Sequence, residues 1–239
     1  MFLRFYSICV LVLVAAAGFA GEQAQVKPLV KDDKIVFLGD SITQGGGGAK
    51  GYITLATKAI TTAHPDFGLT TVNAGISGNK VPNLQSRLEK DVLSKKPTIV
   101  FIYIGINDVW HWKKQPDGTM TGGTPKDKYE EGLKDIIARI TQAGARAILC
   151  TPSVIGEKAA GTNNSDAMLE EYAELSRKVA AETKTQLVDL RKAFLEYLKA
   201  NNPENKDRGI LTGDGVHLNE AGNRLVAEQM LKALGEELK

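Results

Sequence analysis

The sequence has few of the residues that cross-link a fold or bind metals. Its 239 residues include only two cysteines, Cys9 and Cys150, and three histidines. Because Cys9 lies in a hydrophobic leader, Cys150 stands alone in the rest of the chain, which excludes a disulfide framework. Cys150 ends an apolar run and is predicted to be a small core residue. No group of His, Cys, Asp or Glu has the spacing of a metal site, so we expect no bound metal.

The sequence also lacks an excess of charge of one sign. Thirty Lys and Arg residues face 28 Asp and Glu residues, a net charge of +2, and the two signs are interspersed along the chain. Without a basic block to follow a phosphate backbone, nucleic acid is not an expected partner. With 43% hydrophobic and 24% charged residues, the composition is that of an ordinary globular protein.

The N-terminus has the composition of a secretory leader. Arg4 precedes an apolar run at residues 8–17, and the small residues Gly18 and Ala20 follow it. We predict a signal peptide over residues 1–20, cleaved near Ala20, and export to the periplasm or the exterior. The run is short for a bilayer, so no stable membrane insertion is expected after cleavage, and a retained anchor is the alternative. Residues 21–239 are predicted to form a single domain.

Apolar runs and helical patterns alternate along the rest of the chain. Such continuous apolar runs are typical of parallel strands that are buried on both faces. Strands are expected at residues 34–38, 69–74, 98–104, 146–150 and 186–190, and helices at 52–63, 84–93, 127–143, 165–184, 191–200 and 219–238, with a long loop at 108–125. This alternation predicts an α/β fold, a three-layer α/β/α sandwich with a flavodoxin-like five-stranded parallel sheet.

The sequence does not predict a nucleotide-binding site. Residues 46–51 match the pattern G-x-G-x-x-G, but the second predicted strand ends in Val72-Asn73-Ala74 and lacks the acidic residue that would bind a ribose. A P-loop is excluded because Ala49 precedes Lys50 where glycine is required. We therefore expect no cofactor. The G-x-S-x-G motif of α/β-hydrolases is also absent.

Polar residues follow the first three predicted strands. Ser41 comes after the first strand, a loop with Gly78 follows the second, and Asn107 follows the third. Near the end of the chain, Asp214 precedes His217 by three residues. Because the carboxyl ends of parallel strands share one edge of the sheet, these side chains are expected to meet there.

Four segments resemble, in order, the four sequence blocks of the SGNH hydrolases, also called GDSL hydrolases. They are Gly39-Asp40-Ser41, Gly78, Gly105-x-Asn107-Asp108 and Asp214-x-x-His217. Each block is common alone, but four in the right order at strand ends are specific.

The resemblance implies a role for each matching residue. Ser41 would be the nucleophile, His217 the general base and Asp214 the acid that orients the imidazole. The N–H groups of Ser41 and Gly78 and the side-chain amide of Asn107 would form the oxyanion hole. Gly75 also lies in the second block, but Gly78 is preferred because it stands between Ser77 and Asn79, as the glycine of the family pattern does.

The function expected from this resemblance is a serine ester hydrolase that works through an acyl-serine intermediate. Trp110, His111 and Trp112 lie in the long predicted loop, and flat aromatic faces suit sugars, so a short acyl or acetyl ester of carbohydrate is the expected substrate. A lysophospholipase or thioesterase is the alternative enzyme. A non-catalytic carbohydrate-binding protein is the alternative of another class. The sequence gives no indication of oligomeric state.

Overall fold

A five-stranded parallel sheet forms the centre of the molecule. The computed structural model describes residues 26–238, so the predicted leader at residues 1–20 lies outside the described part. The strand order is β2-β1-β3-β6-β7, with β1 at Lys34–Gly39, β2 at Thr70–Gly75, β3 at Ile99–Tyr103, β6 at Arg146–Cys150 and β7 at Gln186–Val188. This is the predicted flavodoxin-like sheet.

The sheet core follows from the apolar runs of the sequence. Every residue of β3 is buried, as are all residues of β1 after Lys34. Phe37 and Phe101 lie in register on these two strands, and their rings stack with centroids 5.3 Å apart. Cys150, at the end of β6, is a buried free thiol, as predicted.

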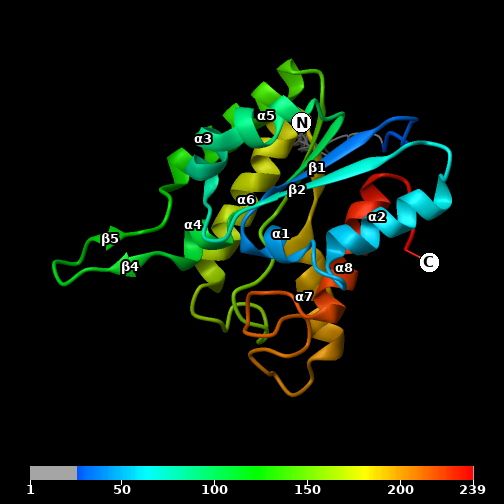
Figure 1. Ribbon diagram of the computed structural model, residues 1–239. Coiled ribbons are helices and arrows are strands. Elements are labelled where there is room, and N and C mark those ends of the chain that lie inside the picture. The colour runs from blue at the N-terminus through cyan, green and yellow to red at the C-terminus, as the bar shows by residue number, and fades with distance from the viewer. Residues whose placement is uncertain (1–25, 239) are drawn as a thin grey trace, which may run out of the picture.

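Helices cover both faces of the sheet (Figure 1). Neighbouring helices α3, α5 and α6 pack in a row on one face, while α8 packs against α2 and α7 on the other. Their bounds are α2 Tyr52–Ala63, α3 Val81–Asp91, α5 Lys126–Gln142, α6 Asp166–Thr183, α7 Leu190–Asn201 and α8 Glu220–Ala233. Two five-residue helices, α1 (Ser41–Gly45) and α4 (Ile106–Trp110), begin at the sheet edge, and a 3-10 turn, η1, spans Leu93–Lys95. The three-layer prediction is confirmed.

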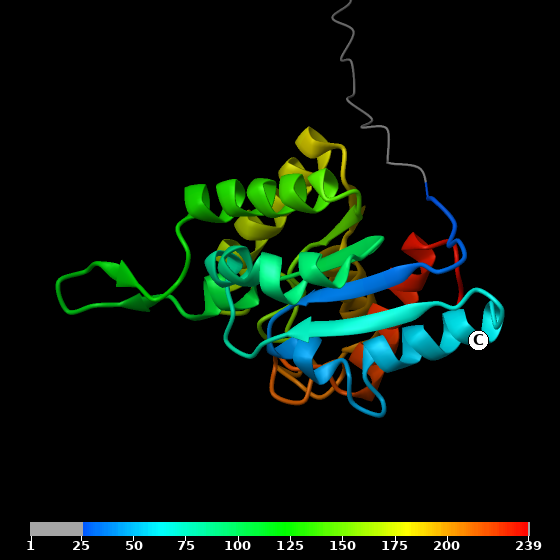
Figure 2. The same ribbon diagram turned by 45° about the horizontal axis from the view of Figure 1, so that its top comes forward.

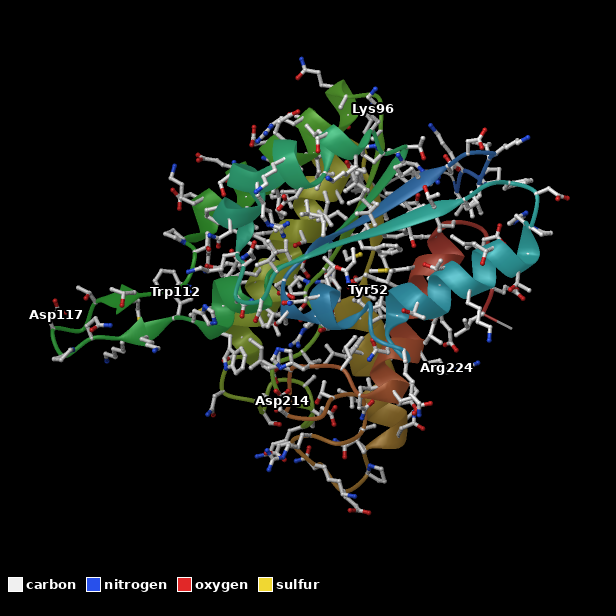
Figure 3. The ribbon with its side chains drawn as sticks, in the orientation of Figure 1. Tyr52, Lys96, Trp112, Asp117, Asp214 and Arg224 are labelled. Carbon is white, nitrogen blue, oxygen red and sulfur yellow. The ribbon has the colours of Figure 1, made fainter. Side chains whose placement is uncertain are left out.

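The expectation of a loop over residues 108–125 is wrong. Helix α4 extends to Trp110, and strands β4 (Lys113–Lys114) and β5 (Met120–Thr121) form an antiparallel hairpin that projects from the body (Figure 2). Its tip is an Asp117-Gly118 turn, far from the sheet in Figure 3, in which Gly118 has φ +86°. An Asp-Gly pair is a hairpin signal, but the flanking segments are too polar and too short to predict as strands.

Two helix boundaries also differ from expectation. Helix α8 ends at Ala233 rather than near residue 238, because Gly235 takes a left-handed conformation with φ +78° that stops the helix. Helix α3 begins at Val81 rather than Leu84, since Pro82 is accommodated in the first turn. Among residues 26–238, no helix combines the length and apolarity needed to cross a membrane.

Candidate active site

The exits of strands β1, β2 and β3 lie level at one edge of the sheet. Gly39 at the end of β1 is in register with Gly75 of β2 and with Tyr103 of β3. The segments that follow these strands, with Ser41, Gly78 and Asn107, therefore start from the same edge, as parallel topology requires.

Ser41 is the first residue of helix α1. The Asp40 carboxylate caps this helix by accepting a hydrogen bond of 2.9 Å from the N–H of Ile42. A side chain at Gly39 has no space, because a Cβ there would lie 2.1 Å from Thr43 Oγ1 and 2.4 Å from the Tyr103 carbonyl oxygen. Glycine thus permits the sharp exit that presents the Ser41 hydroxyl at the rim.

His217 reaches the Ser41 hydroxyl from the loop between α7 and α8. Its Nε2 lies 2.9 Å from Ser41 Oγ, and its Nδ1 lies 2.7 Å from Asp214 Oδ2. The loop around Asp214 lies below α1 in Figure 3. A hydroxyl, an imidazole and a carboxylate therefore form one continuous hydrogen-bonded chain, in which a proton can pass from the hydroxyl to the ring.

Asp214 also shapes the turn that holds His217. Its Oδ1 accepts hydrogen bonds from the backbone N–H groups of Val216, at 2.9 Å, and His217, at 2.7 Å. Partial burial acts to raise the pKa of Asp214, but the hydrogen bonds from His217 and Val216 outweigh it and lower the pKa to about 2. Asp214 is therefore an anion across the neutral pH range, and it favours the Nδ1–H form of the imidazole.

The predicted anion-binding donors line the same edge. No backbone carbonyl of the described chain accepts a hydrogen bond from the N–H of Ser41 or of Gly78. The Asn107 side chain is buried, and its Nδ2 donates to the carbonyl of Asn79 at 3.1 Å, with a longer contact of 3.4 Å to Asp40 Oδ2. These contacts orient the Asn107 amide.

The two glycines of the second motif differ in kind. A Cβ at Gly75 would lie 2.1 Å from the backbone nitrogen of Gln44, so this glycine allows β2 to pass close to helix α1. Gly78 has φ +76°, and a Cβ there would meet no atom within 4 Å. Gly75 is therefore a packing glycine, while Gly78 has open space beside it.

Two buried carboxyl groups accompany Asn107 and were not singled out from the sequence. Burial, reinforced by the neighbouring Asp108 carboxyl, raises the pKa of Asp40 to about 7. Burial likewise raises the pKa of Asp108 to about 6. Asp108 Oδ1 accepts from the N–H of Val81 at 3.0 Å, whereas its Oδ2 has no partner among the described residues. Both residues stand in the quoted motifs, but burial cannot be read from a motif.

The three residues predicted to bind substrate do different things. Trp110 is 45% exposed and lies edge-on to the His217 ring, with centroids 6.3 Å apart. Trp112 instead packs on Gly123, and its Nε1 donates to the Tyr172 hydroxyl at 3.3 Å. His111 lies between them in the chain, and burial together with nearby lysines lowers its pKa. Of the three, Trp110 is the one in ring contact with His217.

An open polar cleft of about 320 Å³ lies beside Trp110 and Asp214. Its walls come from the loop after β6 and from the loop that carries His217, and they include Ile155, Asn163, Asn164, Asp207 and Val216. No group of three or more potential metal ligands occurs among residues 26–238.

Comparison with known proteins identifies the family of the chain. The model of the GDSL-like Lipase/Acylhydrolase family matches residues 37–225, which include every motif described above. The chain belongs to this family. The family membership predicted from the four motifs is thus confirmed. This protein is a hydrolase of ester bonds.

Several relatives of this GDSL hydrolase are acetylxylan esterases. One, from Geobacillus stearothermophilus, is 33% identical and covers 86% of this chain and 95% of its own. A crystal structure of the acetyl xylan esterase AlAXEase is 46% identical, with a TM-score of 0.78, covering 84% of this chain and 99% of that one. The lipoprotein YqeF of Bacillus subtilis (strain 168), which is uncharacterized, is 26% identical over 95% of this chain and 96% of its own.

Solved structures of Axe2, an acetylxylan esterase from Geobacillus stearothermophilus, include catalytic mutants. One is described as a catalytic mutant with a serine replaced by alanine; it has a TM-score of 0.76 at 30% identity, covering 89% of this chain and 98% of that one. Two other catalytic mutants of this esterase carry alanine in place of an aspartate and of a histidine three positions later.

Proposed function

We propose that this GDSL hydrolase is an exported esterase that removes acetyl groups from acetylated carbohydrate through an acyl-serine intermediate. The observation that carries the proposal is the hydrogen-bonded chain from Ser41 Oγ through the His217 imidazole to the Asp214 carboxylate, with distances of 2.9 and 2.7 Å. This geometry supports the proposal that Ser41 is the nucleophile, His217 its base and Asp214 the orienting acid.

Acylation follows from this arrangement. As Ser41 Oγ bonds to the ester carbonyl carbon, its proton moves to Nε2 of His217, and Asp214 stabilises the imidazolium. The tetrahedral oxyanion accepts hydrogen bonds from the N–H groups of Ser41 and Gly78 and from the Asn107 amide, which gives up its long contact of 3.4 Å with Asp40 Oδ2. The carbon–oxygen bond to the alcohol then breaks, and the imidazolium returns its proton to the leaving oxygen.

Deacylation uses the same groups with water as the nucleophile. His217 Nε2 takes one proton from the water as its oxygen bonds to the acyl carbon, and the bond to Ser41 Oγ breaks. Ser41 recovers its proton from the imidazolium, and the carboxylic acid leaves. Variants of a relative support these roles. The catalytic mutants of the Geobacillus esterase alter a serine, an aspartate and a histidine, and the last two have the spacing of Asp214 and His217.

Carbohydrate as the alcohol partner rests on the relatives and on Trp110. Acetylxylan esterases are 33% and 46% identical to the chain. The exposed Trp110 ring stands beside His217, and the adjoining cleft has asparagine and aspartate side chains that can hydrogen-bond sugar hydroxyls. Trp112 then acts by holding this segment, through its contacts with Gly123 and Tyr172, while His111 remains a proposed substrate contact.

Export and domain organisation extend the proposal. We infer that residues 1–20 act as a signal peptide and that residues 21–239 form one domain. Support comes from the leader composition and from the relative named as a lipoprotein. Mass spectrometry of protein recovered from the periplasm or medium of an expressing cell tests this, and a chain that retains residues 1–20 contradicts it.

Replacement of Ser41 by alanine tests the catalytic proposal. With p-nitrophenyl acetate, Ser41→Ala is expected to lower kcat by at least about 10,000-fold, because the triad acts as a unit. Ser94→Ala, on an exposed serine remote from the site, is the matched control and keeps the wild-type rate. Rapid quenching should also give one acetyl group on the peptide that contains Ser41. Equal rates for Ser41→Ala and the wild type would refute the mechanism.

Substrate class needs a second comparison. The wild type is expected to release acetate from acetylated xylooligosaccharides and to cleave p-nitrophenyl acetate much faster than p-nitrophenyl palmitate. Preference for palmitate would instead favour the lysophospholipase or thioesterase alternative.

A further inference from the structure

Glu157 is a fully buried carboxylate outside the four motifs. It lies in the loop between β6 and α6, with 0% of its surface exposed. A buried carboxylate is costly unless several donors satisfy it. All the donors of Glu157 come from one short segment, residues 210–212, which leads directly into Asp214.

Four hydrogen bonds connect Glu157 to that segment. Its Oε1 accepts from the backbone N–H groups of Leu211, at 2.8 Å, and Thr212, at 2.5 Å, and from Thr212 Oγ1, at 2.7 Å. Its Oε2 accepts from the N–H of Ile210 at 2.8 Å. Hydrogen bonds to an ionised acceptor are the strong ones, so this segment is held firmly.

The connection continues to the residues beside the imidazole. Thr212 Oγ1 accepts from the N–H of Gly215 at 3.1 Å, and the N–H of Gly213 donates to the His217 carbonyl at 2.8 Å. The neighbour of Glu157, Gly156, donates its N–H to the Gly215 carbonyl at 2.8 Å. The turn that contains Asp214 is therefore hydrogen-bonded both to Thr212, which Glu157 holds, and to Gly156, the chain neighbour of Glu157.

Core packing contributes little to this positioning. The side chains of His217 and Asp214 are 43% and 51% exposed, so few core atoms surround them. The backbone of their own turn therefore has a large part in placing them, and the Glu157 carboxylate anchors that backbone.

We propose that Glu157 is a positioning residue, which holds the Asp214–His217 turn so that the imidazole meets Ser41. The proposal rests on the roles proposed above for Ser41, Asp214 and His217. Glu157 itself touches no reacting atom.

Glutamine at position 157 is a sharp test because it keeps the shape. If its oxygen takes the place of Oε1, its NH2 group faces the N–H of Ile210, donor against donor. In the reverse orientation, three donors at Leu211 and Thr212 lose their acceptor. Either way the turn shifts. We expect Glu157→Gln to lower kcat for p-nitrophenyl acetate about 10- to 100-fold, the usual effect of a small misplacement, with KM little changed.

Asp33→Asn is the matched control. Asp33 is also a buried carboxylate that accepts from a backbone N–H, that of Val30 at 2.8 Å, but it precedes β1 at the opposite edge of the sheet. Both variants replace a buried carboxyl group by an amide and lose some stability. The proposal expects a loss of kcat from Glu157→Gln alone, measured well below the unfolding temperature of each protein.

Histidine NMR separates positioning from stability. The chain has three histidines, so ¹⁵N-histidine protein gives few ring N–H signals. His64, whose Nε2 lies 2.7 Å from Glu236 Oε1, is an internal reference. In Glu157→Gln, the Nδ1–H signal of the His217–Asp214 hydrogen bond is expected to move upfield or broaden, while the His64 signal stays. Asp33→Asn leaves both signals unchanged.

The outcomes are distinct. A folded Glu157→Gln with wild-type kcat and an unchanged His217 signal overturns the proposal, and the Ser41→Ala result decides separately whether the catalytic mechanism stands. If Glu157→Gln does not fold, Thr212→Val removes one link from Glu157 with little change in volume. A lower kcat with a shifted His217 signal in Thr212→Val supports the proposal, and wild-type values for both overturn it.

Discussion

The guanidinium of Arg87 donates from Nε to Asn79 Oδ1 at 2.7 Å. Its Nη2 donates to the carbonyl of Gly39 at 2.8 Å. Gly39 leads into Ser41, and Asn79 directly follows Gly78, so one side chain on α3 joins the first two motif segments. The Arg87 side chain is 12% exposed, which leaves little room for water to replace these bonds.

Removal of the Arg87 donors is expected to loosen the oxyanion site. Arg87→Met keeps an unbranched apolar stem but no hydrogen-bond donor, and we expect kcat for p-nitrophenyl acetate to fall about tenfold, with a small change in KM. Lys90→Met, at an exposed position of the same helix, is the control. Identical kcat values for the two variants would show that Gly78 needs no support from Arg87.

Asn107 is expected to contribute directly to oxyanion binding. Asn107→Ala should lower kcat about 100- to 1,000-fold, the usual loss when one donor of an oxyanion hole is removed. Because the amide also holds the Asn79 carbonyl, thermal unfolding of the variant is measured alongside its kinetics. A well-folded variant with kcat within about tenfold of the wild type would be inconsistent with this role.

Alanine at Gly75 and at Gly78 should give opposite patterns. Gly75→Ala puts a Cβ 2.1 Å from the Gln44 backbone, so helix α1 or strand β2 must move and the free energy of unfolding should fall sharply. Gly78→Ala meets no atom but strains a left-handed residue, at a cost of about 1–2 kcal/mol. Its main effect should be on kcat. Urea unfolding and p-nitrophenyl acetate kinetics separate them, and the same balance of stability loss and activity loss in both variants would contradict this difference between the two glycines.

Asp40 should make stability depend on pH. Burial raises its pKa from 3.8 in the unfolded chain to about 7 in the fold, so between these values the folded protein binds more protons. The free energy of unfolding therefore falls as the pH rises through this window. Asp108, with its pKa raised by burial to about 6, acts in the same direction. Asp214 has the opposite effect, and its contribution is lost only as the pH falls from 3.8 toward about 2.

The variant Asp40→Asn isolates the first of these contributions. The amide carries no charge, while its oxygen can still cap the Ile42 N–H. We expect the fall in stability between pH 4 and about 7 to become shallower, though not flat, since Asp108 remains. Urea unfolding at a series of pH values measures the slope. A slope equal to that of the wild type would mean that Asp40 is already ionised in the fold.

The centre of the sheet could be predicted from the sequence because its strands are continuous apolar runs, such as residues 35–38 and 99–103. The hairpin around Asp117-Gly118 could not be predicted. Its two strands are exposed, so the sequence has no hydrophobic pattern there. Likewise, the motifs predict roles for Ser41, Asn107 and His217. Glu157 and Arg87 act through contacts with distant backbone groups, and a local pattern does not encode which backbone a buried charge will meet.

Trp110 and Trp112 offer a final test, because two tryptophans separated by one residue have different surroundings. Trp110 is 45% exposed beside the His217 ring, so Trp110→Ala should remove a platform for sugar. An aromatic contact of about 1 kcal/mol corresponds to a loss of about five- to tenfold in kcat/KM for acetylated xylooligosaccharides. The value for p-nitrophenyl acetate, which has no sugar to stack, should change little.

Trp112→Ala removes packing on Gly123 and a hydrogen bond to Tyr172, so it should lower the unfolding temperature and leave the ratio of the two kcat/KM values unchanged. This ratio cancels any general loss of active protein. If Trp110→Ala leaves it unchanged as well, sugar does not stack on Trp110, and the preference for carbohydrate must arise elsewhere in the cleft.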